Sequence, residues 1–429
     1  MTRGIVIVGG LSLFFVVALV AGLISRITDR QSFSPLGHRI VDSYKAVAIV
    51  VLNILILLAC LELAAIGIFG IRSLFSRSTE QLVGEGAPRE KNSYYASKDW
   101  AAQYWHEFVL SRQQRYYPYV GWRRDRFKGK TINIDQHGIR LTPGADCSAN
   151  SYKAFVFGGS TIWGTGSPDW STIPAYLQIG LDALTTKPVC VVNFGESAYV
   201  STQAVIELLR QLQSGNVPDI VLFYDGVNDV YAAYQSGQAG VHQNFDQIAS
   251  TVEGRRFYGE NRLLSFIVLL RGSYSFSLFE ESIARLREKL QHGKKLVTYE
   301  TLKVDRAILS GSVARAYLSN YKIVSALAQK YGFKFGFFWQ PIISIGKKPL
   351  TDEEQDMRRL MDPALVALYD SVYRIIEQSA SEYESLYYMG HIFDEYKSGI
   401  WIDDAHITPA GNQIVAKKMI NIIATRNHA

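Results

Sequence analysis

The sequence contains few of the residues on which metal and disulfide chemistry depend. Only 3 of its 429 residues are cysteine and 8 are histidine. The cysteines form no C-x-x-C pair and the histidines form no H-E-x-x-H array. These spacings are the usual signatures of structural zinc sites and zinc proteases, so neither class is supported and we expect no metal.

A concentrated excess of one charge is also missing. The chain has 45 basic and 39 acidic residues, a net charge of +6 that is spread along its length. Nucleic-acid-binding proteins usually concentrate basic residues on one face, so we expect no nucleic-acid partner. Hydrophobic residues make up 48% and charged residues 20%, which is enough apolar material for a sizeable core and argues against a disordered chain.

Two long apolar runs lie near the N-terminus. Residues 4–24 carry no charge, and a helix of this length reaches about 30 Å, enough to cross a bilayer. Residues 46–71 form a second run, interrupted only by Asn53 and Glu62. Both runs exceed the roughly 7–15 apolar residues of a signal peptide. The sequence therefore predicts a transmembrane two-helix hairpin within residues 1–75.

Basic residues in the short flanks predict how this hairpin is oriented. The loop between the runs has four basic residues and the outer flanks have three: Arg26, Arg30, Arg39 and Lys45 against Arg3, Arg72 and Arg77. The positive-inside rule then places the loop in the cytoplasm and both termini outside. For Glu62 we favour a packing or interfacial role over a functional intramembrane carboxylate, because the other run offers no basic partner.

Residues 76–150 are predicted to form a juxtamembrane linker followed by an aromatic and basic pre-domain. Residues 116–122 read YYPYVGW, and a cluster of basic residues follows them: Arg123, Arg124, Arg126, Lys128 and Lys130. Near a membrane such a cluster can contact anionic head groups or an anionic glycan. A solvated basic face is the interpretation that we favour.

From residue 151 onwards, short apolar runs alternate with helical patterns. The predicted strands are 154–157, 189–192, 220–224 and 333–339, and the predicted helices between them are 171–184, 202–213 and 313–331. This alternation is typical of right-handed βαβ crossovers, which build a parallel sheet covered on both faces. Residues 231–310 break the rhythm and are expected to be an insertion or cap. Its apolar run 263–270 is too short to span a bilayer and is expected to be a buried cap helix.

Polar motifs follow three of these strands, and a fourth lies near the C-terminus. They are Gly158-Gly159-Ser160-Thr161, Asn193-Phe194-Gly195, Gly226-Val227-Asn228-Asp229 and a segment that begins Asp403-Asp404-Ala405-His406. In open α/β sheets, ligands bind beyond the carboxyl ends of the strands. A carboxylate three residues before His406 can accept its Nδ1–H and leave Nε2 free as a base. Thr408-Pro409 predicts the start of the last helix.

These four motifs together resemble the blocks of the SGNH (GDSL-type) hydrolase superfamily. In chain order they match as Gly159-Ser160, Gly195, Gly226-x-Asn228-Asp229 and Asp403-x-x-His406. The resemblance covers about residues 151–230 and 311–425. The sequence departs from the family's Gly-Asp-Ser-Leu form, because Gly159 precedes the serine directly and Thr161 follows it. It implies a three-layer, flavodoxin-like α/β sandwich with a parallel sheet over residues 151–429. The α/β-hydrolase motif G-x-S-x-G does not fit, because Ile162 stands where its last glycine belongs.

The resemblance also implies a role for each matching residue. Ser160 would attack an ester carbonyl, His406 would move the proton, and Asp403 would fix the tautomer of His406. Asp404 is the alternative acid. The oxyanion would be held by the backbone N–H groups of Ser160 and Gly195 and by the side-chain amide of Asn228. No metal or organic cofactor is implied.

The expected function is a membrane-anchored serine esterase that acts on O-acyl, above all acetyl, esters of cell-envelope glycans. Its expected place is the bacterial inner membrane, with the catalytic domain in the periplasm and the lipid bilayer and an acylated glycan as partners. Tyr224, Tyr231 and Tyr234 would either stack on sugar rings or pack in the core. Cys147 and Cys190 would either form a disulfide or stay separate, with Cys190 as a small core residue.

Three other functions stay open at this point. A glycan O-acetyltransferase would use the same triad if water were kept away from the acyl-enzyme. A non-catalytic scaffold would work with other membrane proteins of envelope assembly, although it would not need to keep every residue of the triad and oxyanion set. A phospholipid-directed lipase would need a long apolar acyl channel in the insertion.

Overall fold

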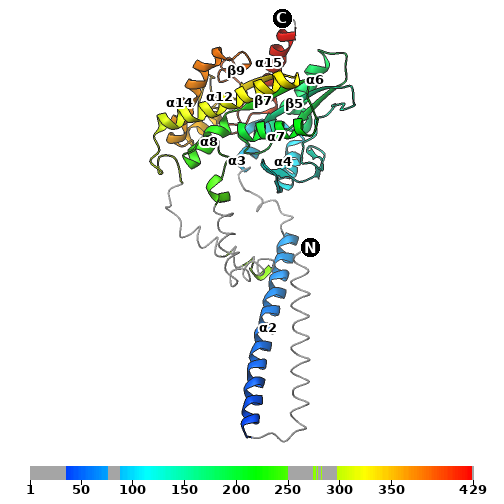
Figure 1. Ribbon diagram of the computed structural model, residues 1–429, viewed down its shortest axis with the longest axis vertical. Helices are drawn as coiled ribbons and strands as arrows, with labels where there is room; N and C mark the ends of the chain where they lie inside the picture. Colours follow the sequence, from blue (N-terminus) through cyan, green and yellow to red (C-terminus); the bar gives the residue numbers. More distant parts are fainter. Residues whose placement is uncertain are drawn as a thin grey trace. The chain divides into compact units, whose positions relative to one another are not determined.

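In the computed structural model, the described residues are 35–75, 87–249, 297–427 and five positions between 274 and 282 (Figure 1). The chain divides into two compact units. One comprises residues 1–82 and 249–294, and the other comprises residues 83–248 and 295–429. The predicted membrane run 4–24 and the predicted cap helix 263–270 lie outside the described residues.

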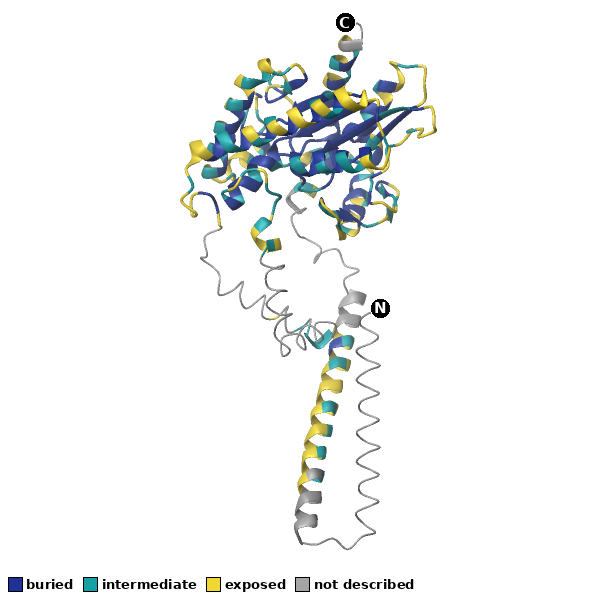
Figure 2. Cartoon of the chain, viewed as in Figure 1, coloured by how far each residue is buried: buried dark blue, intermediate teal, exposed yellow. Residues whose placement is uncertain are grey.

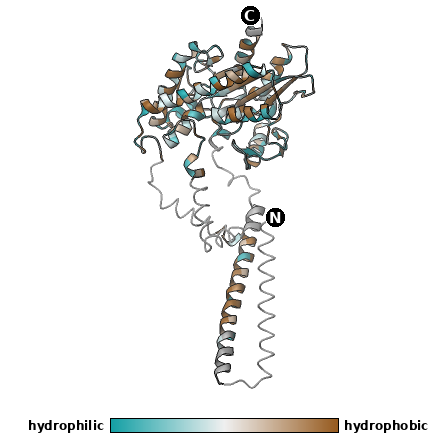
Figure 3. Ribbon diagram, in the orientation of Figure 1, coloured by the Kyte–Doolittle hydropathy of each residue, from teal (hydrophilic) through white to brown (hydrophobic). Residues whose placement is uncertain are grey.

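The first unit contains one long apolar helix. Helix α2 (Pro35–Phe75) is 41 residues long, and its segment Lys45–Ile68 is long and apolar enough to cross a membrane. Its large aliphatic side chains are exposed, for example Val47 at 62% and Leu63 at 69%. Figures 2 and 3 show this stretch as exposed and hydrophobic. Helices that are apolar on all sides are typical of protein cores and of membrane spans.

Glu62 has hydrogen-bond partners from the insertion. Its carboxylate accepts the backbone N–H groups of Tyr274 and Ser275, with N–O distances of 2.6 and 3.0 Å, and also the Ser275 hydroxyl. These contacts fit the packing role that we favour for this carboxylate.

The second unit is built on a five-stranded sheet. Its strands are β5 (Tyr152–Gly158), β6 (Val189–Asn193), β7 (Ile220–Asp225), β8 (Lys334–Trp339) and β9 (Leu386–Tyr388). Their order is β6-β5-β7-β8-β9 and every neighbouring pair is parallel. This is the flavodoxin-like order 2-1-3-4-5, so the predicted α/β fold with a parallel sheet is confirmed. The fifth strand, β9, was not predicted, because three residues carry too little pattern.

Helices cover both faces of the sheet, which makes three layers (Figure 1). Alternate residues of β5 point to opposite faces, as the two-residue period of a strand requires. Phe155 and Phe157 belong to a core with α7 (Ser201–Gln213), α8 (Val227–Ser236), α12 (Arg306–Tyr331) and α14 (Pro363–Ser379). Ala154 and Val156 belong to a second core with α6 (Ile173–Asp182) and α15 (Pro409–Asn427).

Most predicted elements agree with the structure to within two or three residues, but α12 begins earlier than expected. It begins at Arg306 rather than at 313, because the Asp305 side chain caps it by accepting the Ile308 N–H at 2.9 Å. Ile308 is 68% exposed, so the first turn lacks the apolar pattern that marks a buried helix. The short helix α13 (Asp352–Arg359) lies between β8 and α14.

Residues 87–150 pack in the same compact unit as the sheet. They form α3 (Ala87–Glu90), the 3-10 turn η1 (Ser93–Ser97), α4 (Ala101–Leu110) and two antiparallel ribbons. The ribbons pair β1 (Gln114–Tyr117) with β2 (Gly121–Arg124), and β3 (Phe127–Lys128) with β4 (Asn133–Ile134). Aromatic side chains of η1 and α4 form a third core, which Trp163 joins from the sheet side.

Two members of the basic cluster do not lie on a solvated or lipid-contacting face, contrary to both interpretations of the sequence. Arg123 is fully buried and pairs with Glu207 at 3.3 Å. Arg124 is buried against the Trp163 ring, 3.7 Å from its centre, and pairs with Glu196 at 3.5 Å. Buried cations need such partners, and a single sequence does not reveal these distant acids.

Cys147 and Cys190 form a disulfide, with their Cα atoms 4.7 Å apart. The bond ties the segment before β5 to strand β6, next to the pairing of β5 with β6. Cys60 in α2 is a free, exposed thiol.

Candidate active site

Ser160 lies at the carboxyl end of β5. The strand ends at Gly158, Gly159 caps the next turn, and Ser160 opens the short helix α5 (Ser160–Trp163). A Cβ atom on Gly159 would lie 2.2 Å from the Asn228 Nδ2 atom, which is impossibly close. Glycine is therefore required at 159 for the Asn228 side chain, which follows β7, to lie against the Ser160 turn.

Ser160, His406 and Asp403 form a hydrogen-bonded chain. The Ser160 Oγ atom lies 2.7 Å from His406 Nε2. The His406 Nδ1 atom lies 2.8 Å from Asp403 Oδ2 and 3.0 Å from Oδ1. With Nδ1–H donated to the carboxylate, Nε2 is free to accept the serine proton, which is the arrangement that a nucleophilic serine needs. Asp404, the alternative acid, lines the pocket instead of contacting Nδ1.

The loop that carries the histidine is fixed from several sides. The Ile402 N–H donates to the His406 carbonyl, and Trp401 pairs with Ile407 across the loop. Two side chains from the segment before α4 also hold it. Arg89 Nε donates to Asp403 Oδ2, and Asn92 Nδ2 donates to the Trp401 carbonyl at 3.1 Å. Residues far apart in sequence therefore position the acid of the triad.

The two neighbouring aspartates have opposite electrostatic environments. Burial alone would raise the pKa of Asp403, but the charges of His406 and Arg89 and the hydrogen bonds from His406 outweigh it and hold that pKa far below its usual range. Burial and the charge of Asp403 raise the pKa of Asp404 to about 6. Asp403 is therefore the carboxylate that stays ionised and can stabilise a histidinium.

Two of the predicted oxyanion donors lie at the pocket. Asn228 lines it, with Nδ2 donating to the Tyr199 carbonyl at 2.8 Å and Oδ1 accepting Gln243 Nε2 at 2.9 Å. The second hydrogen on Nδ2 remains available to a ligand. Ser160 is the first residue of α5, and its backbone N–H has no hydrogen-bond partner among the described residues.

The structure does not bring Gly195 to the pocket, contrary to the role that the resemblance implies. Gly195 is buried, and its N–H donates to the Asn193 Oδ1 atom at 3.0 Å. Three residues later the loop turns at Ala198, which lines the pocket and has a positive φ of 64°. Within the described chain the Ala198 N–H has no hydrogen-bond partner. An alanine at this φ is uncommon, and no sequence signal marks it.

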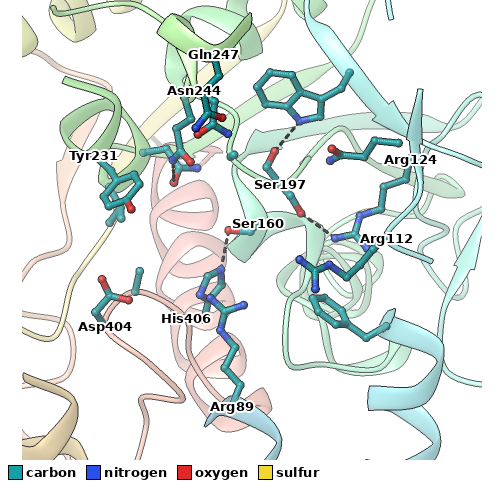
Figure 4. Close-up of a pocket in the computed structure, with 18 of the residues that line it drawn as sticks. Arg89, Arg112, Arg124, Ser160, Ser197, Tyr231, Asn244, Gln247, Asp404 and His406 are labelled. Carbon is teal, nitrogen blue, oxygen red and sulfur yellow. Dashed lines mark hydrogen bonds between the residues drawn. The ribbon is translucent and has the colours of Figure 1, made fainter. Parts of the chain in front are cut away.

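The pocket over Ser160 has a volume of about 760 Å³ and a wall of both polar and apolar side chains. Figure 4 shows Ser160 and His406 facing each other, with Tyr231, Asn244 and Gln247 on one side and Arg112 and Arg124 on the other. Of the three tyrosines considered for sugar stacking, only Tyr231 lines this pocket. Tyr224 is fully buried in the sheet core, and Tyr234 packs against Tyr299 with 5% of its surface exposed.

Sequence reasoning missed three residues that contact the predicted site residues or line the pocket beside them: Arg89, Ala198 and Gln243. Arg89 lies in the segment expected to be a linker, and Gln243 lies in the expected insertion. No cluster of three or more residues with metal-ligand side chains is present in the part of the chain that the structure describes.

Comparisons with known proteins add distant structural likenesses. No family model matches the chain, and no curated protein does so. A solved acetyl xylan esterase is 15% identical, with 63% of this chain and 99% of that one covered and a TM-score of 0.33. A lipolytic G-D-S-L family protein from Veillonella parvula is 12% identical, with 63% and 97% covered and a TM-score of 0.32.

An acetyl-xylooligosaccharide esterase from a Geobacillus species, solved as a mutant, is 15% identical, with 65% and 95% covered and a TM-score of 0.33. Because the identities and TM-scores are this low, the function of this chain has to be inferred from its own site.

Proposed function

We propose that this chain is a membrane-anchored serine esterase of the SGNH type that acts on O-acyl, above all acetyl, esters of cell-envelope glycans. One observation carries the proposal. A serine, a histidine and an aspartate stand in hydrogen-bond contact at the carboxyl edge of a parallel sheet, with Ser160 Oγ 2.7 Å from His406 Nε2. This geometry is what acyl transfer to a serine requires.

The reaction follows from the positions of these groups. Ser160 Oγ forms a bond to the ester carbonyl carbon while His406 Nε2 takes its proton. The resulting oxyanion would be held by the N–H of Ser160, the amide of Asn228 and the N–H of Ala198, which takes the place proposed for Gly195. The intermediate then expels the alcohol, which receives the proton from His406. Water, deprotonated by His406, attacks the acyl-enzyme, releases the acid and restores Ser160.

Two observations support a site outside the cytoplasm. Helix α2 contains a segment long and apolar enough to span a membrane, and Cys147 and Cys190 form a disulfide. Disulfides persist in oxidising compartments such as the bacterial periplasm and are rare in the cytosol. Together with the basic loop between the apolar runs, they favour a multi-pass inner-membrane protein with a periplasmic catalytic domain.

The amide side chains in the pocket wall favour a carbohydrate ester over a lipid ester. Side-chain amides from two segments line the pocket: Gln114 from β1, and Asn244 and Gln247 from the stretch after α8. Such groups can form hydrogen bonds with sugar hydroxyls, which an acyl chain does not offer.

The test is to measure how the acyl group is partitioned between products. Purified full-length protein is given a chromogenic acetyl ester with and without a glycan acceptor, and free acetate and acetylated sugar are counted. An esterase releases acetate in both cases, Ser160→Ala abolishes release, and the exposed-serine control Ser398→Ala leaves it unchanged. Dominant acetylation of the sugar would instead identify an acyltransferase, and no turnover of any ester would favour the scaffold.

A further inference from the structure

A second hollow adjoins the active-site pocket. It has a volume of about 590 Å³ and shares three wall residues with the pocket over Ser160: Gln114, Trp122 and Ile248. The two hollows therefore lie next to each other on the same compact unit. Each has a size usual for sites that bind small ligands.

The wall of this second hollow is rich in aromatic rings. Tyr116, Tyr119 and Trp122 come from the β1–β2 hairpin, and His242 and Phe245 come from the segment after α8. Tyr116 and Tyr119 are 79% and 81% exposed. Large aromatic side chains so open to solvent have no packing role, and a cluster of them marks a binding surface.

Several hydrogen bonds hold the hairpin that presents these rings. The Gln203 side chain donates to the Val120 carbonyl at 2.6 Å, and Tyr199 donates to the Trp122 carbonyl. The Trp122 indole donates to the Ser197 carbonyl at 2.9 Å. Beneath them lies the buried Arg123–Glu207 ion pair. A binding surface built in advance loses little conformational entropy when a ligand binds.

We propose that this aromatic hollow binds the sugars that flank the acylated residue, so that the substrate is a glycan chain and not a single sugar. The proposal rests on the esterase function above. A sugar ring has an apolar C–H face and a rim of hydroxyls. Tyrosine and tryptophan match it with an apolar ring and a polar tip. An acyl chain fits less well, because Thr202 and His242 interrupt the apolar wall.

The experiment compares substrates of increasing length on the full-length protein in detergent. The probes are a chromogenic acetyl ester and acetylated mono- and oligosaccharides of β-linked xylose and of β-linked N-acetylglucosamine. For at least one series, kcat/KM is expected to rise with chain length. The double variant Tyr116→Ala with Tyr119→Ala should lower kcat/KM for the longer oligosaccharides about tenfold, mainly by raising KM. Its kcat/KM for the chromogenic ester should be unchanged.

Matched variants separate ring stacking from loss of structure. Tyr116→Phe with Tyr119→Phe keeps both rings and should keep most of the gain, and Tyr331→Ala removes an exposed tyrosine outside both hollows. No rise with length in either series, or an equal loss on the chromogenic ester, would overturn the proposal. If no ester is turned over at all, the esterase function itself fails. A gain from long-chain acyl esters that the double variant removes would identify a lipid site instead.

Discussion

The Asp403 carboxylate depends on an arginine from a distant part of the chain. Arg89 Nε donates to Asp403 Oδ2, the same oxygen that lies 2.8 Å from His406 Nδ1. Arg89 precedes strand β5 by more than sixty residues in sequence, so only the fold reveals its contact with Asp403.

We expect Arg89→Ala to lower kcat about tenfold with little change in KM, because one charge-assisted hydrogen bond to the acid, worth about 1.5 kcal/mol, is lost. Arg89→Lys should recover part of the rate. The exposed Arg359→Ala, whose side chain is 73% exposed, serves as the control. A rise in KM at unchanged kcat would show that Arg89 binds substrate instead of orienting Asp403.

A second carboxyl, Asp225 at the end of β7, is buried without a hydrogen-bond partner for either side-chain oxygen among the described residues. Burial and the nearby charge of Asp229 raise the pKa of Asp225 well above its usual value. Burial likewise raises the pKa of Asp229 to about 6. The folded state therefore holds protons that the unfolded chain releases above about pH 4.

This predicts a fall in stability as the pH rises. Because the folded protein binds more protons, the free energy of unfolding decreases with pH between the unfolded pKa and the raised folded values. Asp225→Asn removes one of these groups, so it should raise the melting temperature by several degrees at pH 8 and much less at pH 5. Thermal melts at the two pH values measure this. Equal destabilisation at both would contradict the protonated-carboxyl account.

Among the elements, the disulfide offers the clearest test. Cys147 and Cys190 are 43 residues apart in sequence. Closing a loop of this length lowers the conformational entropy of the unfolded chain, which stabilises the folded state by about 4 kcal/mol. Cys147→Ser with Cys190→Ser should lower the midpoint of denaturant unfolding, and a reductant should do the same to the wild type but not to this variant. Cys60→Ser is the control, since that thiol is free. An unchanged midpoint in the double variant would show that the bond does not stabilise the fold.

How far each element could be predicted depended on how it is buried. Strands β5 to β8 are continuous apolar runs because both faces of the sheet are covered, and all four were predicted close to their observed bounds. The β1–β2 and β3–β4 ribbons were not predicted. Exposed residues such as Tyr116 and Arg115 give these ribbons no alternating apolar pattern. Contacts with residues distant in sequence hold them in place, for example the ion pair between Arg123 and Glu207.

The same contrast applies within the site. Ser160, Asn228, Asp403 and His406 follow strand ends or form a compact motif, so their positions could be inferred from local sequence. The roles of Ala198 and Gln243 depend on backbone φ and on a contact across fifteen residues, which leave no local pattern. Gly195 was chosen because glycine permits close approach, but the Asn193 side chain takes its N–H.

At the scale of the whole molecule, the membrane topology can be tested directly. We predict that residues 76–429 and the N-terminus lie outside and that residues 25–45 lie in the cytoplasm, because the loop between the apolar runs carries the larger share of basic residues. A reporter active only in the cytoplasm should be silent when fused after Ala429 and active when fused within residues 26–45. Activity at Ala429 would reverse the orientation and remove the periplasmic substrate with it.

The most direct test of the esterase proposal is a double-mutant cycle on the triad. Ser160 and His406 are in hydrogen-bond contact and act as one proton-transfer unit, so Ser160→Ala and His406→Ala should each abolish most turnover of a chromogenic acetyl ester. The double variant should be hardly worse than either single variant. If instead the two losses multiply as independent effects, Ser160 and His406 do not form a catalytic unit and the account of this site is wrong.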